Sequence, residues 1–249
     1  MISVCIAVHN GEKFLKEQLQ SILSQIAKND EIVISDDGSC DDTIRVIRDF
    51  NDSRIKLFFL KQSDNNKYSH YYVTKNFENA IKNASGDYIF LADQDDFWFP
   101  DKVNVCMREL KKYDLVIHNI RIADDKLNDL GKNVYAKEFF FKNIFMLEGS
   151  YYGCAMAFNK NVLNYALPFP KKLLVHDIWI GLLTEFLGSV HFINKPLILY
   201  RVREESISHS VHNSLLYKIS YRIYTLLFLL LRILRFRSIY TVEKTKKQR

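Results

Sequence analysis

The chain has 249 residues, of which 48% are hydrophobic and 26% are charged, and this composition argues for a packed core and against intrinsic disorder. Its net charge is +6, but residues 217–249 hold nine Lys or Arg and one Glu, which leaves the first 216 residues at −2. A nucleic-acid-binding body is therefore not expected, and the basic tail is predicted to meet an anionic partner.

The N-terminal segment predicts a buried strand. Residues 2–8 are mostly apolar, but they lack the basic flank and the length of a secretory signal, so we expect the protein to stay in the cytoplasm. The four cysteines, Cys5, Cys40, Cys106 and Cys154, lie far apart and form no Cys-x-x-Cys pair. They are expected to be reduced, mostly buried thiols, and neither a zinc cluster nor a disulfide framework is indicated.

Strands and helices alternate along the first half of the chain. Strands are expected at residues 31–35, 55–60, 88–92 and 114–118, and helices at 12–26, 41–50, 74–84 and 100–112. This order predicts an α/β fold with a mostly parallel, Rossmann-like sheet flanked by helices. Ligands of such sheets bind at the carboxyl ends of the strands, where the polar clusters 9–12, 36–39 and 93–96 fall.

The second half has a weaker pattern. It predicts an ordered stretch around residues 149–158, a helix at 177–186, short strands near 190–193 and 197–200, and a helical tail. We expect this half to complete the ligand cleft rather than to form an independent domain.

The sharpest motif is Asp93-Gln94-Asp95-Asp96, which follows a predicted strand. Three carboxylates within four residues repel one another unless a cation lies among them. A hard divalent ion with oxygen ligands, Mg²⁺ or Mn²⁺, is the expected counter-ion and would bridge to a substrate diphosphate. The alternative is a solvated acidic loop ahead of Pro100, against which the aromatic run at 97–99 argues.

A second motif, Asp36-Asp37-Gly38-Ser39, follows the second predicted strand. One of its carboxylates could accept hydrogen bonds from a base imide or a ribose hydroxyl. The alternative is turn chemistry alone, with Ser39 capping the next helix.

A third motif is His176-Asp177, ahead of an apolar helical segment. Asp177 could act as a general base on an acceptor hydroxyl. The alternative is that Asp177 is only the N-cap of that helix.

The tail interleaves apolar and aromatic residues with Arg over residues 217–237. Its apolar run at 224–231 is far shorter than the roughly 20 residues that span a bilayer. The pattern favours an amphipathic helix that lies in the headgroup region of an anionic membrane. The alternative is a helix packed on the body or at the interface of a homodimer.

In this order along residues 1 to about 210, the motifs resemble family 2 glycosyltransferases, which have the GT-A fold. The segments that carry the resemblance are 6–15, 33–43, 86–96, 176–179, 200–201 and 206–209. The family's usual Thr-Tyr-Asn is Val8-His9-Asn10 here. The segment His176-Asp177-Ile178-Trp179 is similar to bacterial surface-polysaccharide transferases of the rhamnosyl or galactosyl type.

The resemblance implies a role for each matching residue. The nucleotide site would include Val8, Asn10, Glu12, Asp36, Asp37, Asp93 and Gln94, with Asp37 as the base contact. Asp93 and Asp95 would hold Mn²⁺ or Mg²⁺, and Asp177 would be the catalytic base. Contacts to the diphosphate or the acceptor would come from Trp98, His176, Arg201, Arg203 and His209; many relatives carry His in place of Arg203.

The implied function is inverting, metal-dependent transfer from a UDP- or dTDP-sugar to a lipid-linked saccharide of a bacterial capsule or cell wall. Residues 1–210 would be the catalytic domain, with a nucleotide-binding half (1–118) and an acceptor-binding half (119–210). Residues 211–249 would bind the inner face of the cell membrane peripherally.

Two other functions remain open from the sequence. A sugar nucleotidyltransferase normally needs a glycine-rich loop with a basic residue after the first strand, which residues 9–12 do not provide. A non-catalytic membrane scaffold is disfavoured by the joint presence of Asp37, Asp93, Asp95 and Asp177.

Overall fold

The computed structural model describes residues 1–60, 69–135, 151–173, 175–202 and 215–247. One sheet runs through this part of the chain in the order β3-β2-β1-β4-β8-β6-β9-β5, with β7 paired to β6. Its strands are β1 (Ile2–Val8), β2 (Glu31–Asp36), β3 (Ile55–Phe59), β4 (Tyr88–Ala92), β5 (Phe97–Trp98), β6 (Leu115–Ala123), β7 (Asp129–Val134), β8 (Met156–Asn159) and β9 (Val190–Arg201).

The sheet is parallel in its first half and mixed in its second. β1 pairs in parallel with β2 and β4, and β2 pairs in parallel with β3. β8 then runs antiparallel to both β4 and β6, whereas β6 and β9 are parallel. The predicted α/β class is confirmed, and the parallel arrangement applies to the four strands that the sequence identifies most clearly.

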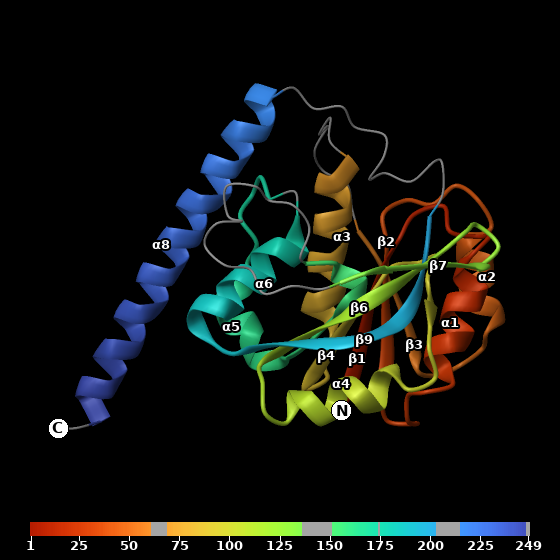
Figure 1. The fold of residues 1–249 in the computed structure, drawn as a ribbon, viewed down its shortest axis with the longest axis horizontal. Helices are drawn as coiled ribbons and strands as arrows, with labels where there is room; N and C mark the ends of the chain where they lie inside the picture. The colour runs from red at the N-terminus through yellow and green to blue at the C-terminus, as the bar shows by residue number, and fades with distance from the viewer. Residues whose placement is uncertain (61–68, 136–150, 174, 203–214, 248–249) are drawn as a thin grey trace.

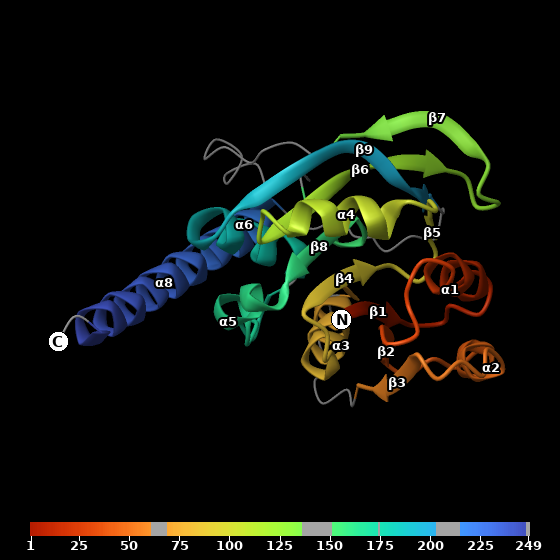
Figure 2. The ribbon, with the colours of Figure 1, turned by 90° about the horizontal axis from the view of Figure 1, so that it is seen from below.

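Helices cover the sheet, and two 3₁₀ turns flank β8 (Figures 1 and 2). The helices are α1 (Leu15–Leu23), α2 (Thr43–Asp49), α3 (Ser69–Asn83), α4 (Lys102–Leu110), α5 (Leu163–Ala166), α6 (His176–Leu187) and α8 (Leu215–Lys247), and the turns are η2 (Gly153–Ala155) and η3 (Lys160–Val162). α3 packs against β1 and β2, and α4 packs against β6, β8 and β9. Because layers cover both faces, β1, β2 and β4 are buried along almost their whole length and are mostly apolar.

Some element boundaries differ from those expected. The two short strands predicted near 190–193 and 197–200 are one strand, β9. The residues between them, Asn194-Lys195-Pro196, are typical of a turn but belong to this strand. The register between β6 and β9 shifts next to Asn119, and this irregularity accommodates Pro196 within the pairing. α3 begins at Ser69 rather than near residue 74, and β7 was not predicted.

A buried glutamate ties together the amino-terminal ends of the parallel strands. Glu31 is 2% exposed, and its carboxylate accepts hydrogen bonds from Ser3 Oγ (2.5 Å), Ser85 N (2.7 Å) and Ser85 Oγ (2.8 Å), and from Lys56 Nζ (2.6 Å). Burial alone would raise the pKa of Glu31, but the hydrogen bonds from Lys56, Ser3 and Ser85 outweigh it and lower the pKa from 4.5 to about 2. The carboxylate therefore stabilises the fold in its ionised form.

The C-terminal helix α8 packs along the side of the body that α5 and α6 form (Figure 1). Arg232 donates to the carbonyls of Tyr165 (2.9 Å), Leu167 (2.9 Å) and Pro168 (2.7 Å), and its guanidinium lies 5.4 Å from the centre of the Trp179 ring. The opposite face carries apolar side chains that are more than half exposed: Ile223, Leu227, Leu230, Leu231 and Leu234. None of the described helices is long and apolar enough to cross a membrane.

Replacing Glu31 by Gln should lower the free energy of unfolding by about 2 kcal/mol, because hydrogen bonds to a charged acceptor are lost from a buried position. The folded-state pKa lies below the unfolded one, so this stabilisation is present above about pH 4.5 and disappears as the pH falls towards 2. Denaturant unfolding of wild type and E31Q at pH 7 and pH 3 measures both effects.

The matched control for E31Q is D49N, whose carboxylate pairs with Arg45 on the exposed face of α2 and should change stability by less than about 0.5 kcal/mol. Equal stabilities of E31Q and wild type at pH 7 would contradict the role assigned to Glu31.

Candidate active site

The carboxyl ends of β1, β2 and β4 meet at one edge of the sheet. Val8 pairs with Asp36 in the register of β1 and β2, and its carbonyl accepts hydrogen bonds from Asp37 N (3.3 Å) and Asn76 Nδ2 (3.0 Å). The loops after these strands carry most of the residues predicted to bind a nucleotide, so the parallel register brings them together.

The turn after β2 is held by side-chain hydrogen bonds. Asp36 Oδ2 accepts from the backbone N–H groups of Gly38 (2.9 Å) and Ser39 (3.1 Å), and Ser39 Oγ donates to Asp36 Oδ1. Gly38 has a φ of +100°, a left-handed conformation that favours glycine. Asn10 joins this turn, because its N–H donates to Ser39 Oγ (2.9 Å) and its Oδ1 accepts from Cys40 N (2.8 Å).

Glu12 contacts the beginning of α2. Its backbone N–H donates to Asp41 Oδ2 (3.2 Å), and its Oε2 accepts from Asp42 N (2.9 Å). The prediction that Ser39 caps this helix is wrong, since Asp41 Oδ1 accepts from Thr43 N (3.0 Å) while Ser39 is engaged in the preceding turn. Asp36, Asn10 and Glu12 thus shape the loops that surround the candidate nucleotide site.

Gln94 joins the loop after β4 to the loop after β1. Its Oε1 accepts from His9 N (2.9 Å) and its Nε2 donates to His9 O (3.0 Å), so one amide satisfies both backbone groups of His9. A Cβ atom on Gly11 would lie 2.7 Å from Gln94 Oε1, which explains why glycine is present there. The acidic run is therefore fixed relative to the first loop through its second residue.

Asp37 lies buried beneath His9, with 2.7 Å between Asp37 Oδ1 and His9 Nδ1. Burial raises the pKa of Asp37, and the nearby His9 ring opposes this rise. The carboxyl group stands at the strand edge where a nucleotide base is expected.

The side chains that converge beyond β4 are Asp93, Asp96 and Cys154. One carboxylate oxygen from each aspartate and the Cys154 sulfur all lie within 4.8 Å of one another. Asp96 is 1% exposed, and its Oδ1 accepts from Arg201 N (3.2 Å). The Asp95 side chain is not part of this three-residue cluster, although its charge acts on both neighbouring aspartates.

The electrostatics of this cluster are unfavourable without a cation. Burial, together with the charges of Asp95 and Asp177, raises the pKa of Asp93 to about 7. Burial and the charges of Asp93 and Asp95 raise the pKa of Asp96 well above its usual value. Both shifts mean that ionising these carboxyl groups is costly in this environment.

The residues present fit a hard divalent cation. Mg²⁺ and Mn²⁺ prefer oxygen ligands, which the aspartates supply. Burial raises the pKa of the Cys154 thiol well above its usual value, so the sulfur stays protonated and is not the donor of choice for such an ion. The partly buried carboxylate of Asp93 and the buried carboxylate of Asp96, with Asp95 beside them, can therefore hold the ion predicted from the sequence.

Asp177 faces the acidic cluster from the beginning of α6. Its Oδ1 accepts from Ile178 N (2.7 Å) and its Oδ2 accepts from Gly153 N (3.2 Å). Burial raises the pKa of Asp177 to about 6, and the two backbone N–H donors partly oppose that rise. Its charge raises the pKa of Asp93, so the fold brings together two carboxylates that are 84 positions apart in the chain.

His176 and Trp98 are largely enclosed by protein. His176 is 7% exposed and stacks on Phe77 with 4.2 Å between ring centres, and burial lowers its pKa to about 3. Its Nε2 has no hydrogen-bond partner among the described residues. Trp98 is 1% exposed, and the centre of its ring lies 4.1 Å from Lys102 Nζ, so its side chain is packed within the protein.

Arg201 is buried at the end of β9 and binds protein groups. Its Nε donates to Asp95 O (2.8 Å), its Nη2 to Glu17 Oε2 (2.6 Å), and its Nη1 to the carbonyl of Asp125. Its guanidinium also lies 4.6 Å from the centre of the Phe14 ring. This side chain fixes the acidic loop against α1.

The predicted contacts Arg203 and His209 lie outside the described residues.

Three residues of this site are assigned no individual role in the sequence interpretation: Asp96, Gly153 and Cys154. Asp96 carries a signal, because it is the third carboxylate of the acidic run. Gly153 and Cys154 carry none, since their function depends on contacts with residues far away in the sequence.

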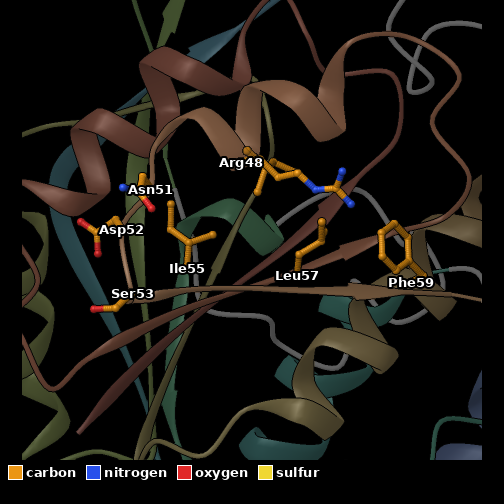
Figure 3. A pocket seen from close by; sticks show the side chains of 8 residues that line it. Arg48, Asn51, Asp52, Ser53, Ile55, Leu57 and Phe59 are labelled. Atoms are coloured by element: carbon orange, nitrogen blue, oxygen red, sulfur yellow. The ribbon is translucent and has the colours of Figure 1, made fainter.

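A separate hollow of about 490 Å³ lies between α2 and β3 (Figure 3). Residues such as Arg48, Asp52 and Phe59 line it, and no predicted site residue does. The candidate active site is therefore defined by the converging side chains rather than by this hollow.

Comparison with known proteins identifies the family and the fold of the chain. Residues 3–165 match the family model described as Glycosyl transferase family 2. A relative from Escherichia coli, UDP-Glc:alpha-D-GlcNAc-diphosphoundecaprenol beta-1,3-glucosyltransferase WfgD, is 27% identical over 214 residues, which cover 84% of this chain and 79% of the relative. The chain spans only about a third of three other relatives (36%, 31% and 36%).

Two solved structures share the fold. Staphylococcus aureus TarS 1–349 in complex with UDP-GlcNAc superposes with a TM-score of 0.70 at 18% identity, over 94% of this chain and 66% of that one. The mannosyltransferase PcManGT from Pyrobaculum calidifontis, in complex with GDP-Man and Mn²⁺, gives a TM-score of 0.58 at 18% identity, over 83% and 58%. These matches confirm the GT-A fold expected from the sequence.

Adding Mn²⁺ should raise the thermal stability of the wild-type protein, because a cation relieves the repulsion between the buried carboxylates. Binding that is confined to the folded state contributes about 2.7 kcal/mol at a free ion concentration a hundred times the dissociation constant. Thermal unfolding with Mn²⁺ and with EDTA measures the effect, which should be lost in D93N and in D96N.

The control for the Mn²⁺ experiment is D87N, at the other end of β4, where Asp87 is exposed and pairs with the N-terminus. D87N should respond to Mn²⁺ as the wild type does. The same Mn²⁺ response in D93N and D96N would rule out a cation site at this cluster.

Proposed function

The chain belongs to glycosyl transferase family 2, and we propose that it moves a sugar from a UDP- or dTDP-sugar to a hydroxyl group of a membrane-associated, lipid-linked saccharide. The observation that carries this proposal is the convergence of Asp93, Asp96 and Asp177 beyond β4. A carboxylate cluster that suits a cation, together with a nearby basic carboxylate, suits the displacement of a nucleoside diphosphate by a hydroxyl group.

The donor nucleotide would lie over the carboxyl ends of β1, β2 and β4. Asp37 is the proposed contact for the base, within loops that Asn10, Glu12, Asp36 and Gln94 hold in place. In this proposal residues 1–118 bind the nucleotide, and residues 119–210 bind the acceptor. A UDP-sugar is supported by the name of the E. coli relative and by the UDP-GlcNAc complex of TarS.

Asp177 is the proposed general base. Burial raises its pKa to about 6, so it is ionised at neutral pH yet basic enough to take a proton from the acceptor hydroxyl. The backbone N–H groups of Gly153 and Ile178 hold the carboxylate in one orientation. As the proton leaves, the acceptor oxygen attacks the anomeric carbon in a single in-line displacement, which inverts the configuration.

Asp93 and Asp95 are the proposed ligands of Mn²⁺ or Mg²⁺, with Asp96 in the same cluster as Asp93. A divalent cation, when bound, would stabilise negative charge on the leaving nucleoside diphosphate. Arg201 would keep this acidic loop in place through Asp95 O. His176 lines the acceptor side, and Arg203 and His209 remain proposed contacts to the diphosphate.

The acceptor would be presented at a membrane surface. The name of the E. coli relative describes action on a diphosphoundecaprenol-linked sugar, which supports a lipid-linked acceptor here. The exposed stripe of α8 (Ile223, Leu227, Leu230, Leu231 and Leu234), together with Arg222, Arg235 and Arg237, suits a helix lying in an anionic headgroup region. Capsule or cell-wall synthesis at the cytoplasmic face of the membrane is part of this proposal.

Purified protein with Mn²⁺ and a panel of UDP- and dTDP-sugars should release nucleoside diphosphate from one donor, faster when a membrane lipid extract is present. D177N should lower kcat by roughly 10²-fold or more, because a general base is removed while the shape is kept. D49N, at an exposed position of α2, is the control. Because the base acts when ionised, wild-type activity should fall as the pH drops below about 6.

Turnover of D177N at the wild-type rate would show that Asp177 is not the base. No release from any donor, together with no Mn²⁺-dependent nucleotide binding, would reject the proposed function as a whole.

The wild-type protein should sediment with vesicles that contain phosphatidylglycerol and not with pure phosphatidylcholine vesicles. A variant in which Leu227, Leu230 and Leu234 are replaced by Gln should stay in solution with unchanged thermal stability, because these side chains are exposed. The control carries Leu130→Gln, at an exposed apolar position of β7. Unchanged sedimentation of the triple variant with vesicles would contradict membrane binding by the stripe. If the wild type is a dimer and the triple variant is a monomer, the stripe is instead a dimer interface.

A further inference from the structure

Lys102 occupies an unusual position for a lysine. It is fully buried, at 0% exposure, and it is the first residue of α4. Burial is unfavourable for an ammonium group, and the positive end of the helix dipole makes this position still less favourable for a cation. A buried cation of this kind requires specific partners, and its partners indicate what it does.

The ammonium group binds the backbone rather than a carboxylate. Lys102 Nζ donates to the carbonyl oxygen of Cys154 at 2.7 Å, and it lies 4.1 Å from the centre of the Trp98 ring. Within the described residues, no Asp or Glu oxygen forms an ion pair with it, although Asp93 and Asp96 are near enough to influence its charge. Lys102 therefore holds the backbone at Cys154, next to the acidic cluster.

That segment, η2, connects the two chemical parts of the candidate site. Gly153 N donates to Asp177 Oδ2 at 3.2 Å, and the next residue, Cys154, places its side chain against Asp93 and Asp96. The fit is close, because a Cβ atom on Gly153 would lie 3.0 Å from His176 Nε2. A shift of this short segment would move the base relative to the acidic cluster.

We propose that Lys102 is a positioning residue for the transfer reaction: it fixes the backbone of Gly153 and Cys154 and so sets the separation of Asp177 from Asp93 and Asp96. This inference rests on the proposed function of the site. Lys102 is not proposed to contact the substrate. Lys102 affects the geometry of proton removal by Asp177, and nucleotide binding does not depend on Lys102.

K102M removes the ammonium and keeps the length of the side chain, and G153A disturbs the same segment without touching Lys102. The matched structural control is R54M, because Arg54 also donates to backbone carbonyls, those of Leu23 (3.1 Å) and Ile26 (2.9 Å), neither of which belongs to the acidic run or to η2. For each folded variant, kcat, the Mn²⁺-dependent dissociation constant of UDP, and hydrogen exchange of residues 151–156 are measured.

K102M and G153A should lower kcat by about tenfold or more, since small displacements of reacting groups have effects of this size, while the dissociation constant of UDP stays within about threefold. K102M should also lose exchange protection in residues 151–156, whether or not transfer is detected. R54M should lose thermal stability and keep the kcat of its folded fraction.

Wild-type kcat and unchanged protection in K102M would overturn the positioning role. A rise in the UDP dissociation constant that parallels the fall in kcat would overturn it as well, by showing that Lys102 acts on the nucleotide. If K102M does not fold, K102Q decides by the same readouts, and wild-type kcat with unchanged protection in K102Q would overturn the positioning role. Absence of transfer by the wild type would contradict the proposed function, and the exchange data would still decide whether Lys102 holds the segment.

Discussion

The crowding of partly or fully buried carboxylates beyond β4 is the constraint on which the rest of the site depends. Burial raises the pKa values of Asp93, Asp96 and Asp177, and the charges of neighbouring carboxylates add to this rise at Asp93 and Asp96. The protein compensates this charge only in part, with backbone N–H groups from Gly153 and Ile178 on Asp177 and from Arg201 on Asp96. A divalent cation among these carboxylates would relieve their repulsion. The unfavourable charge in the protein alone therefore agrees with the cation that we propose.

The parallel half of the sheet supplies the rigid frame around that space. Side chains from one loop satisfy the backbone of another: Gln94 binds both backbone groups of His9, and Asn10 binds Cys40 N. The mixed half brings in the remaining parts, because β8 and η2 deliver Gly153 and Cys154 to the end of β4. Preorganised groups of this kind lower the cost of reaching a transition state.

The sequence identified the parallel strands and the acidic motifs because their signals are local. Continuous apolar runs marked β1, β2 and β4, and the order of the motifs indicated the family. Contacts between distant residues could not be predicted in this way. The Arg201 side chain reaches the carbonyl of Asp95 across 106 positions, and Lys102 reaches Cys154 across 52. A pattern within a window of a few residues contains no information on either contact. The break predicted between residues 193 and 197 is wrong for a related reason, since the pairing of β9 with β6 continues through Pro196.

The central claim is that the nucleotide and its cation bind where Asp93, Asp96 and Asp177 converge. A crystal structure of the protein grown with UDP and Mn²⁺, with anomalous data to locate manganese, tests this most directly. The account predicts a manganese peak bound to carboxylate oxygens of the acidic run, a diphosphate beside it and the base near Asp37. A manganese ion or nucleotide bound elsewhere, with the carboxylates of the run contacting neither, would contradict it.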